Sequence, residues 1–323
     1  MKALILRGIE QVEMADLPVP AIQPDQVLVR NRVCAVCNAT DTKMYRGKHA
    51  LVTFPSVFGH EGAGVVEAVG SAVTRVRPGD RVLGAGYPAS EGLGSFWGQY
   101  SEYGVAREDE TVPVPEGVPL DHAALSHMLG EALNALRIAR IQPGEHIVII
   151  GCGAVGLSLL TVVQHAYPAS ITMMDISDEK LALAKSLGAT HTVNTFREDA
   201  AARLAETTGG EGVNVLFEAV GSPKTYDLAY ELVNRGGLII PFGMIEGTLE
   251  LPFRKLYAKQ LQLRFVRSAG DRGPENKRLV LGMMQRGLIR PDRLITARFP
   301  LAAFDEAARS IMAGGQVRVL MDI

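Results

Sequence analysis

The sequence predicts an α/β protein that combines a β-barrel with a doubly wound parallel sheet. The chain has 323 residues, which is longer than a single core usually supports, so two domains are expected. Residues 1–120 contain short apolar runs separated by turns such as Pro78-Gly79-Asp80, which favours a barrel. From about Asp121, strand and helix patterns alternate, which is typical of βαβ units with a parallel sheet.

The expected elements follow from these patterns in chain order. For the barrel we expect strands over Met1–Arg7, Val27–Ala35, Gly62–Val69 and Arg81–Leu83, with a loop over Gly84–Gly98 that is rich in glycine, serine and proline. For the sheet we expect a helix over Asp121–Arg140, strands over His146–Ile150, Ile171–Asp175, Val213–Ala219 and Leu238–Phe242, and helices that begin at Ala154, Asp178 and Ser222. The chain then continues with a strand over Gln262–Val266, helices over Pro274–Arg286 and Ala303–Met312, and a strand over Val317–Met321.

Composition excludes several kinds of partner. The net charge is −2 and the basic residues are scattered, so we expect neither nucleic acid nor an anionic membrane as partner. No apolar stretch is long enough to span a bilayer, and the first apolar run is too short for a signal peptide. The simplest prediction is a soluble cytoplasmic protein.

Three cysteines occur, Cys34, Cys37 and Cys152, and an odd number argues against a disulfide framework. Cys34 and Cys37 form a C-x-x-C motif, which could be a redox pair. A redox pair needs a helix N-terminus to lower the pKa of its thiol, whereas this motif ends a valine-rich strand. Three cysteines also cannot provide a structural zinc site with four thiolates.

Gly151-Cys152-Gly153-Ala154-Val155-Gly156 joins the strand that ends at Ile150 to a helix, and this context makes it a dinucleotide-binding loop. Gly151 allows the tight turn, Gly153 admits the pyrophosphate, and Gly156 lets helix and strand pack closely. The phosphates then lie at the positive end of the helix dipole.

Asp175 ends the next strand, 24 positions after Gly151. A carboxylate there accepts hydrogen bonds from the adenosine ribose and repels a 2′-phosphate, so NAD is favoured over NADP. Alternatively, Asp175 only caps the helix that begins near Asp178, but Ser177 fills that position better.

Cys37 and the pair His60-Glu61 predict a zinc site, because zinc prefers thiolate and imidazole. Gly59, Gly62 and Gly64 would let the backbone crowd around an ion. A metal site together with a nucleotide loop implies redox chemistry on an alcohol or carbonyl.

These motifs together resemble the zinc-dependent medium-chain dehydrogenases, the superfamily of alcohol, sorbitol and threonine dehydrogenases. The matching segments are Gly59-His60-Glu61-x-x-Gly64, Val73-x-x-x-x-Pro78-Gly79-Asp80-Arg81-Val82, the nucleotide loop, and Phe217-Glu218-Ala219-Val220-Gly221. The resemblance implies a chaperonin-10-like barrel built from residues 1–127 and 269–323, and an inserted Rossmann domain over 128–268.

The resemblance also implies the metal ligands, which are Cys37, His60 and a third residue shortly before the nucleotide domain. Counting back seventeen residues from Gly144 gives His127, with His122 as a fallback. Alternatively, His127 packs in the core and Cys37, His60 and Glu61 hold the metal alone. Because neighbouring strand residues point to opposite faces, Glu61 is either a further ligand from behind or a carboxylate that tunes the site. The family's structural-zinc lobe is missing, so one zinc ion per subunit is expected.

The resemblance assigns roles around the metal as well. Thr40 would pass the substrate proton outward and Asp41 would orient His60. One residue is inserted after Cys37, so Ala39 could take the hydroxyl position instead, with water completing the relay. Phe58, Phe96 and Trp97 are expected to line the substrate pocket.

Further cofactor contacts are expected from Ile176 and Lys180 near the ribose, Val220, Phe242 and Gly243 near the nicotinamide, and Arg318 at the pyrophosphate. The predicted activity is a zinc-dependent, NAD-linked interconversion of a secondary alcohol or polyol and its carbonyl product. In it, zinc acts as a Lewis acid and a hydride passes to the nicotinamide. A zinc-free quinone or enoyl reductase of the same superfamily, or a non-catalytic member, is the alternative. The resemblance places the apolar strands Leu238–Phe242 and Gln262–Val266 where relatives pair subunits edge to edge, so a homodimer or homotetramer is expected.

Overall fold

The protein is described by a computed structural model covering residues 1–245, 247–266 and 273–323. Contacts divide the chain into two compact units. The first unit comprises residues 1–127 and 277–323, and the second comprises residues 128–276. The chain therefore returns to the first unit between Asn276 and Lys277, inside a helix. The predicted boundary at residues 268 and 269 falls outside the described residues.

The first unit contains two sheets. One has the strand order β2-β1-β4-β7, and the other has the order β15-β16-β3-β5-β6, with β8 also paired to β3. The strands are β1 (Lys2–Gly8), β2 (Gln11–Asp16), β3 (Gln26–Ala35), β4 (Ser56–Val57), β5 (Glu61–Val69), β6 (Arg81–Leu83), β7 (Gly94–Ser95), β8 (Tyr103–Arg107), β15 (Ile295–Pro300) and β16 (Arg318–Asp322). The helices are α1 (Thr40–Tyr45), α2 (Leu120–Ala124), α9 (Gly273–Gln285, which crosses the boundary) and α10 (Phe304–Met312).

Strand β16 ties the two sequence segments of the first unit together. It pairs antiparallel with β3, so that Leu320 lies opposite Ala35 and Met321 opposite Cys34. Strand β5 pairs antiparallel with the other edge of β3. The ends of β3, β5 and β16 therefore meet, which brings Glu61 at the start of β5 and Arg318 at the start of β16 close to the turn that follows β3.

An aromatic cluster forms the core beneath these strands. Tyr45, Phe58, Tyr100 and Phe304 are buried, and Phe58 packs edge-on against both Tyr100 and Phe304. The prediction that Phe58 lines a substrate pocket is therefore wrong, because its side chain has no exposed surface.

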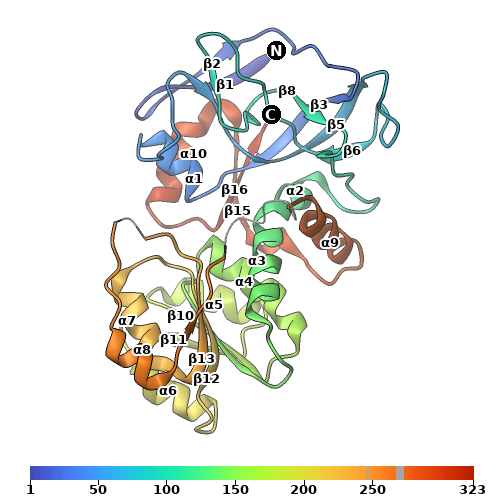
Figure 1. The fold of residues 1–323 in the computed structure, drawn as a ribbon. Coiled ribbons are helices and arrows are strands. Elements are labelled where there is room, and N and C mark those ends of the chain that lie inside the picture. Colours follow the sequence, from blue (N-terminus) through green and yellow to red (C-terminus); the bar gives the residue numbers. More distant parts are fainter. Residues whose placement is uncertain (246, 267–272) are drawn as a thin grey trace. The chain divides into compact units, whose positions relative to one another are not determined.

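The second unit is a six-stranded parallel sheet with the order β11-β10-β9-β12-β13-β14. Helices cover both faces, with α3 and α4 on one side and α6, α7 and α8 on the other (Figure 1). The strands are β9 (His146–Ile150), β10 (Ser170–Asp175), β11 (His191–Asn194), β12 (Val213–Glu218), β13 (Val233–Pro241) and β14 (Gln262–Leu263). The helices are α3 (Ser126–Ala139), α4 (Ala154–Val163), α5 (Asp178–Ser186), α6 (Ala200–Thr207), α7 (Pro223–Leu232) and α8 (Phe253–Lys259). The strand order reverses between β9 and β12, which is where doubly wound sheets bind nucleotides.

Some predicted elements differ from the observed ones. The single helix expected over Asp121–Arg140 is two helices, because Leu125 closes α2 with a hydrogen bond to the carbonyl of His122. His127 therefore lies in the first turn of α3. The strand expected over Gln262–Val266 extends only over Gln262–Leu263. Within the described residues, no helix is long and apolar enough to cross a membrane.

Candidate metal centre and candidate nucleotide site

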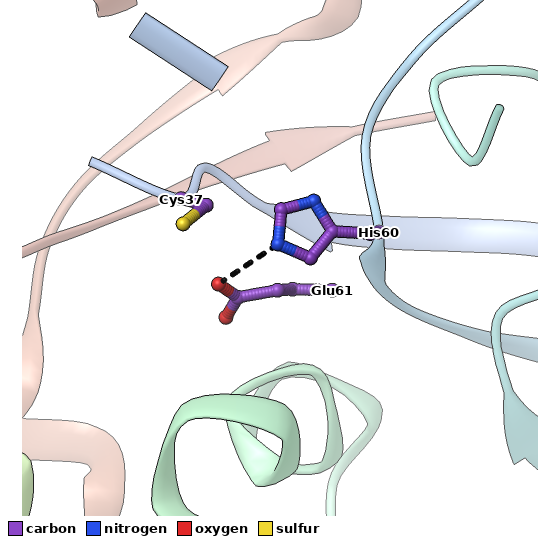
Figure 2. Close-up of side chains that lie close together, drawn as sticks. All are labelled: Cys37, His60 and Glu61. Carbon is purple, nitrogen blue, oxygen red and sulfur yellow. Dashed lines mark ion pairs between the residues drawn. The ribbon is translucent and has the colours of Figure 1, made fainter. Parts of the chain in front are cut away.

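Cys37, His60 and Glu61 lie together and are buried. One ligand atom from each residue lies within 4.8 Å of the others, and the sulfur, ring and carboxylate face one another (Figure 2). Zinc binds such atoms at about 2.0–2.3 Å, so only a small contraction would bring all three onto one ion. The structure therefore brings together the three residues that the sequence predicted as a cluster.

The glycines in the segment Gly59-His60-Glu61-Gly62-Ala63-Gly64 allow the backbone around His60 and Glu61 to pack tightly against Tyr100 and strand β3. Gly59 has a φ of +90°, and a Cβ there would lie 2.7 Å from the ring of Tyr100. A Cβ at Gly64 would lie 2.2 Å from the carbonyl oxygen of Arg30 on β3. We expected these glycines to make room for an ion, but they make room for an aromatic ring and a neighbouring strand.

Cys37 lies in the turn between β3 and α1. Its sulfur accepts a hydrogen bond from the backbone N–H of Thr40 at 3.4 Å. Its own N–H donates to Oδ2 of Asp41 at 3.0 Å. The turn thus fixes the sulfur at the cluster and supplies a hydrogen-bond donor to it.

His60 has an acidic neighbour at each ring nitrogen. Nδ1 lies 3.4 Å from Oδ1 of Asp41, and Nε2 lies 3.8 Å from Oε1 of Glu61. Burial disfavours a charged ring, but Asp41 and the Cys37 sulfur outweigh burial and raise the pKa of His60 well above its ordinary value. A bound cation would neutralise the excess of negative charge around His60.

Glu61 faces both the cluster and Arg318. Its Oε2 accepts a hydrogen bond from Nη2 of Arg318 on β16, while Oε1 is buried with no hydrogen-bond partner. Burial disfavours the guanidinium, yet the adjacent Glu61 and Cys37 raise the pKa of Arg318. The structure gives Arg318 a partner that the sequence did not predict. A contact with the pyrophosphate stays a prediction, and it requires surface that the fully buried side chain does not expose here.

His127 lies beside the cluster but is not one of its three members. Its ring contacts the ring of His60 edge-on, with the centroids 5.1 Å apart, and its Nδ1 is buried without a hydrogen-bond partner. Burial, with Lys277 and His60 nearby, lowers the pKa of His127 well below its ordinary value. A neutral imidazole with an unused lone pair can bind a metal, so ligation by His127 stays a prediction.

Thr40 and Asp41 form the start of α1. Asp41 is fully buried and is the carboxylate nearest Nδ1 of His60. Thr40 is half-buried, and its role in a proton relay stays a prediction. Cys34, the other half of the C-x-x-C motif, is buried, and burial together with Asp41 raises the pKa of its thiol well above the ordinary value. Such a thiol is unsuited to redox exchange.

Trp97 lies over the ring of His60, with ring centroids 4.6 Å apart. It is 54% exposed and has a φ of +61°, although tryptophan rarely adopts the left-handed region. Phe96 packs against Trp97 on one side and His49 on the other. These contacts place Phe96 and Trp97 next to the cluster, whereas Phe58 lies in the core.

The nucleotide loop has a distinct geometry at each glycine. Gly151 has a φ of +102°, and a Cβ at Gly156 would lie 1.7 Å from the carbonyl oxygen of Gly151. A Cβ at Gly153 would meet nothing within 4 Å. The loop is therefore closely packed at Gly156 and open at Gly153, where the pyrophosphate is expected. Ala154 and Val155 continue into the first turn of α4.

Asp175 ends β10 and organises the same loop. Its Oδ2 accepts a hydrogen bond from the backbone N–H of Cys152 at 2.7 Å, and its Oδ1 accepts from those of Ile176 and Ser177. Ser177, not Asp175, caps helix α5 by accepting from the N–H of Lys180. The alternative in which Asp175 is only a helix cap is therefore wrong.

Glu218 ends β12 and belongs to the segment Phe217–Gly221 that carries the family resemblance, but the resemblance assigns it no role. Its buried carboxylate accepts hydrogen bonds from the N–H groups of Val220 and Gly221 and from the hydroxyl of Thr225. The N–H groups of Phe242 and Gly243 both donate to its backbone carbonyl. Glu218 thus holds both segments that were expected to contact the nicotinamide, and its place at a strand end was the available signal.

The two arrangements together define a class of protein. Proteins of this class have a buried cluster of sulfur, imidazole and carboxylate groups in one unit and a dinucleotide-type loop on a parallel sheet in the other. Comparison with known proteins narrows this class. Residues 23–116 match the family described as alcohol dehydrogenase GroES-like domain, and residues 154–284 match the family described as zinc-binding dehydrogenase. The chain belongs to the zinc-dependent medium-chain dehydrogenases.

Individual relatives span almost the whole chain. An L-threonine 3-dehydrogenase from Anaeromyxobacter sp. (strain Fw109-5) is 29% identical, with 100% of this chain and 99% of the relative covered. A D-arabitol-phosphate dehydrogenase from Enterococcus avium is 28% identical, with 98% and 95% covered. The structure of alcohol dehydrogenase TADH from Thermus sp. ATN1 superimposes with a TM-score of 0.88 at 26% identity and covers 100% of this chain and 99% of that one.

Proposed function

We propose that this protein is a zinc-dependent, NAD-linked dehydrogenase that interconverts a secondary alcohol or polyol and its carbonyl product. The observation that carries the proposal is the cluster of Cys37, His60 and Glu61. The zinc-free quinone or enoyl reductase is the alternative, but it has no use for a buried thiol, imidazole and carboxylate held together. A non-catalytic role is disfavoured for the same reason.

The donor set fits zinc. Cys37 and His60 would hold the ion, and Glu61 has a buried oxygen without a partner that points into the cluster. His127, with its unpartnered Nδ1, would be the further ligand. When bound, zinc supplies Lewis acidity toward an alcohol or carbonyl oxygen.

The protein's own residues orient the reaction. Asp41, whose Oδ1 lies 3.4 Å from Nδ1 of His60, would orient the ring so that Nε2, 3.8 Å from Oε1 of Glu61, faces the cluster. Thr40 would receive the proton of the substrate hydroxyl and pass it outward. Trp97 and its neighbour Phe96 would contact the carbon chain of the substrate, because Trp97 packs on His60 and exposes half of its surface, and Phe96 packs on Trp97.

NAD is the proposed cofactor. Asp175 carries a fixed negative charge at the loop, and the adjacent Ile176 is 71% exposed and available to the adenine. A 2′-phosphate would be repelled by this carboxylate. Lys180 near the ribose, together with Val220, Phe242 and Gly243 near the nicotinamide, complete the proposed cofactor contacts.

We further propose a homodimer or homotetramer. Strand β14 forms one edge of the parallel sheet, and Phe253, Tyr257 and Phe265 nearby in sequence are each more than 70% exposed. Contact with a second copy of the chain would cover these side chains and remove their apolar surface from water. A cytoplasmic location stays a prediction from the sequence.

The test is a screen of secondary alcohols, polyols and their phosphates with NAD and NADP, using protein of measured zinc content. We expect activity with NAD that disappears on chelation and returns with zinc. Cys37→Ala should abolish both zinc binding and activity, whereas Cys34→Ala, in the same motif but outside the cluster, should keep both. Full activity after complete removal of zinc would refute the proposal.

A further inference from the structure

A buried hydroxyl lies next to Asp41, the carboxylate beside His60. Tyr100 is fully buried, and its hydroxyl donates a hydrogen bond to Oδ2 of Asp41 at 2.6 Å. The backbone at Tyr100 is held on both sides, because its N–H donates to Phe58 and its carbonyl accepts from Leu4. The position of this hydroxyl is therefore fixed by the strands around it.

The two oxygens of Asp41 have different surroundings. Oδ2 accepts two hydrogen bonds, from the hydroxyl of Tyr100 and from the N–H of Cys37. Oδ1 accepts no hydrogen bond and lies 3.4 Å from Nδ1 of His60. Since both donors hold Oδ2, the carboxylate cannot rotate without losing them, and Oδ1 stays directed at His60.

We propose that Tyr100 is a positioning residue of the metal centre, whose hydroxyl fixes Asp41 so that His60 presents Nε2 to the metal. This inference rests on the proposed function, because it concerns the same metal site. A carboxylate held beside a ligand histidine sets the tautomer and orientation of its ring, and Oδ1 of Asp41, 3.4 Å from Nδ1 of His60, is placed to do so. Tyr100 extends this control by one residue, because it holds the other oxygen of Asp41.

The hydroxyl, rather than the ring, carries this role. The ring packs against Phe58 and Phe304, and a phenylalanine would make these contacts equally well. A buried hydroxyl without a partner costs free energy, so its presence here requires the acceptor on Asp41. Burial, and then Asp41, raise the pKa of Tyr100 well above its ordinary value, which keeps the hydroxyl a donor.

The same core supplies a matched control. Tyr45 is also buried and also packs against Phe304, and its hydroxyl donates to Oδ1 of Asp305 at 2.9 Å. Asp305 belongs to α10 and is not part of the cluster of Cys37, His60 and Glu61. Tyr45→Phe therefore removes the same kind of hydrogen bond from the same aromatic core without affecting Asp41.

The experiment compares Tyr100→Phe and Tyr45→Phe in the full chain. Zinc affinity is measured by competition with a chelating dye, and the geometry of the site by the thiolate charge-transfer band of the cobalt-substituted protein. We expect Tyr100→Phe to weaken zinc binding by about 3- to 10-fold, less than the roughly 10- to 100-fold typical of direct partners of a ligand. The cobalt spectrum should shift in Tyr100→Phe and remain unchanged in Tyr45→Phe.

A double-mutant cycle tests whether Tyr100 acts through Asp41. In an Asp41→Asn background, Tyr100→Phe should cause no further loss of zinc affinity, because the carboxylate that it positions is gone. Additive losses would show that Tyr100 acts by another route and would overturn the proposal.

The remaining outcomes are also decisive. Equal zinc affinity and spectra in wild type and Tyr100→Phe would overturn the positioning role and leave the proposed function intact. A wild-type protein that binds no zinc through Cys37 would refute both. If Tyr100→Phe fails to fold while Tyr45→Phe folds, the hydroxyl serves the core rather than the metal site, and the proposal is wrong.

Discussion

The cluster around Cys37 and the loop around Gly153 differ in how the chain assembles them. The cluster collects buried side chains from the turn after β3 and from the start of β5, and it is joined by Arg318 of β16, which lies 257 positions from its partner Glu61. The loop lies within one strand, turn and helix, and backbone N–H groups and glycines shape it. The first site therefore depends on long-range packing of charges, and the second on local backbone geometry.

The largest expected effect concerns the buried charge of Glu61. Arg318→Met should lower the free energy of unfolding of the zinc-free protein by about 3–5 kcal/mol, because it leaves a buried carboxylate unpaired. Chemical denaturation would measure the loss. Arg298→Met on the paired strand β15 is the control, since Arg298 is 46% exposed beside Asp121 and Asp322 and should contribute about 1 kcal/mol or less. Equal losses in the two variants would contradict this account.

The second prediction separates two glycines of the nucleotide loop. Gly156→Ala should destabilise the cofactor-free protein by about 1–3 kcal/mol, because its Cβ would overlap the carbonyl of Gly151. Gly153→Ala should change stability by about 0.5 kcal/mol or less, yet weaken NAD binding where the open space is filled. Denaturation and cofactor titration together distinguish the two. Equal stability of both variants would show that the close contact at Gly156 is relaxed at little cost.

A smaller effect is expected for cofactor choice. Asp175→Asn should reduce the preference for NAD over NADP by about tenfold, roughly 1.4 kcal/mol, because the charge that repels the 2′-phosphate is removed. The ratio of kcat/KM values for the two cofactors measures it. Asp178→Asn is the control, because this exposed carboxylate is already paired with Arg197. An unchanged ratio in Asp175→Asn would assign cofactor choice to other residues.

The smallest effect is on thiol reactivity. Burial, and then the neighbouring Asp175, raise the pKa of Cys152 far above its ordinary value. A raised pKa keeps the thiol protonated, so alkylation of native Cys152 should stay slow between pH 7 and 9, the range in which a free thiol near pKa 8.5 becomes reactive. Mass spectrometry of iodoacetamide-treated protein would show this, with urea-unfolded protein as the reference. Rapid labelling of the native protein would mean that the loop opens readily.

The same contrast explains what the sequence could predict. The strand at His146–Ile150, the loop at Gly151 and the cap at Ser177 follow from local patterns, and the structure has them. By contrast, β11 and α6 are not predicted. For β11 the reason is that His191–Asn194 is short and three of its four residues are polar, so it gives no periodic signal. The break between α2 and α3 at Leu125 could not be predicted either, because no proline or glycine occurs there.

At the candidate metal site, the sequence predicted the ligand residue types but not all of the side chains that hydrogen-bond or ion-pair with them. Cys37, His60 and Glu61 were expected together because their chemistry suits one ion. The pairing of Glu61 with Arg318 and of Asp41 with Tyr100 depends on which strands lie side by side, and neither residue type nor spacing carries that information. The position of Phe58 could not be predicted for the same reason, because only the packing of the folded chain shows that its side chain faces the core.

The pairing of Glu61 with Arg318 also sets an order of events during synthesis. A nascent polypeptide already contains Cys37, His60 and Glu61 long before the ribosome reaches Arg318. Until then the glutamate has no counter-charge and β16 cannot dock beside β3. The carboxylate of the proposed metal site therefore gains its counter-charge only after Arg318 has been translated and β16 has paired with β3.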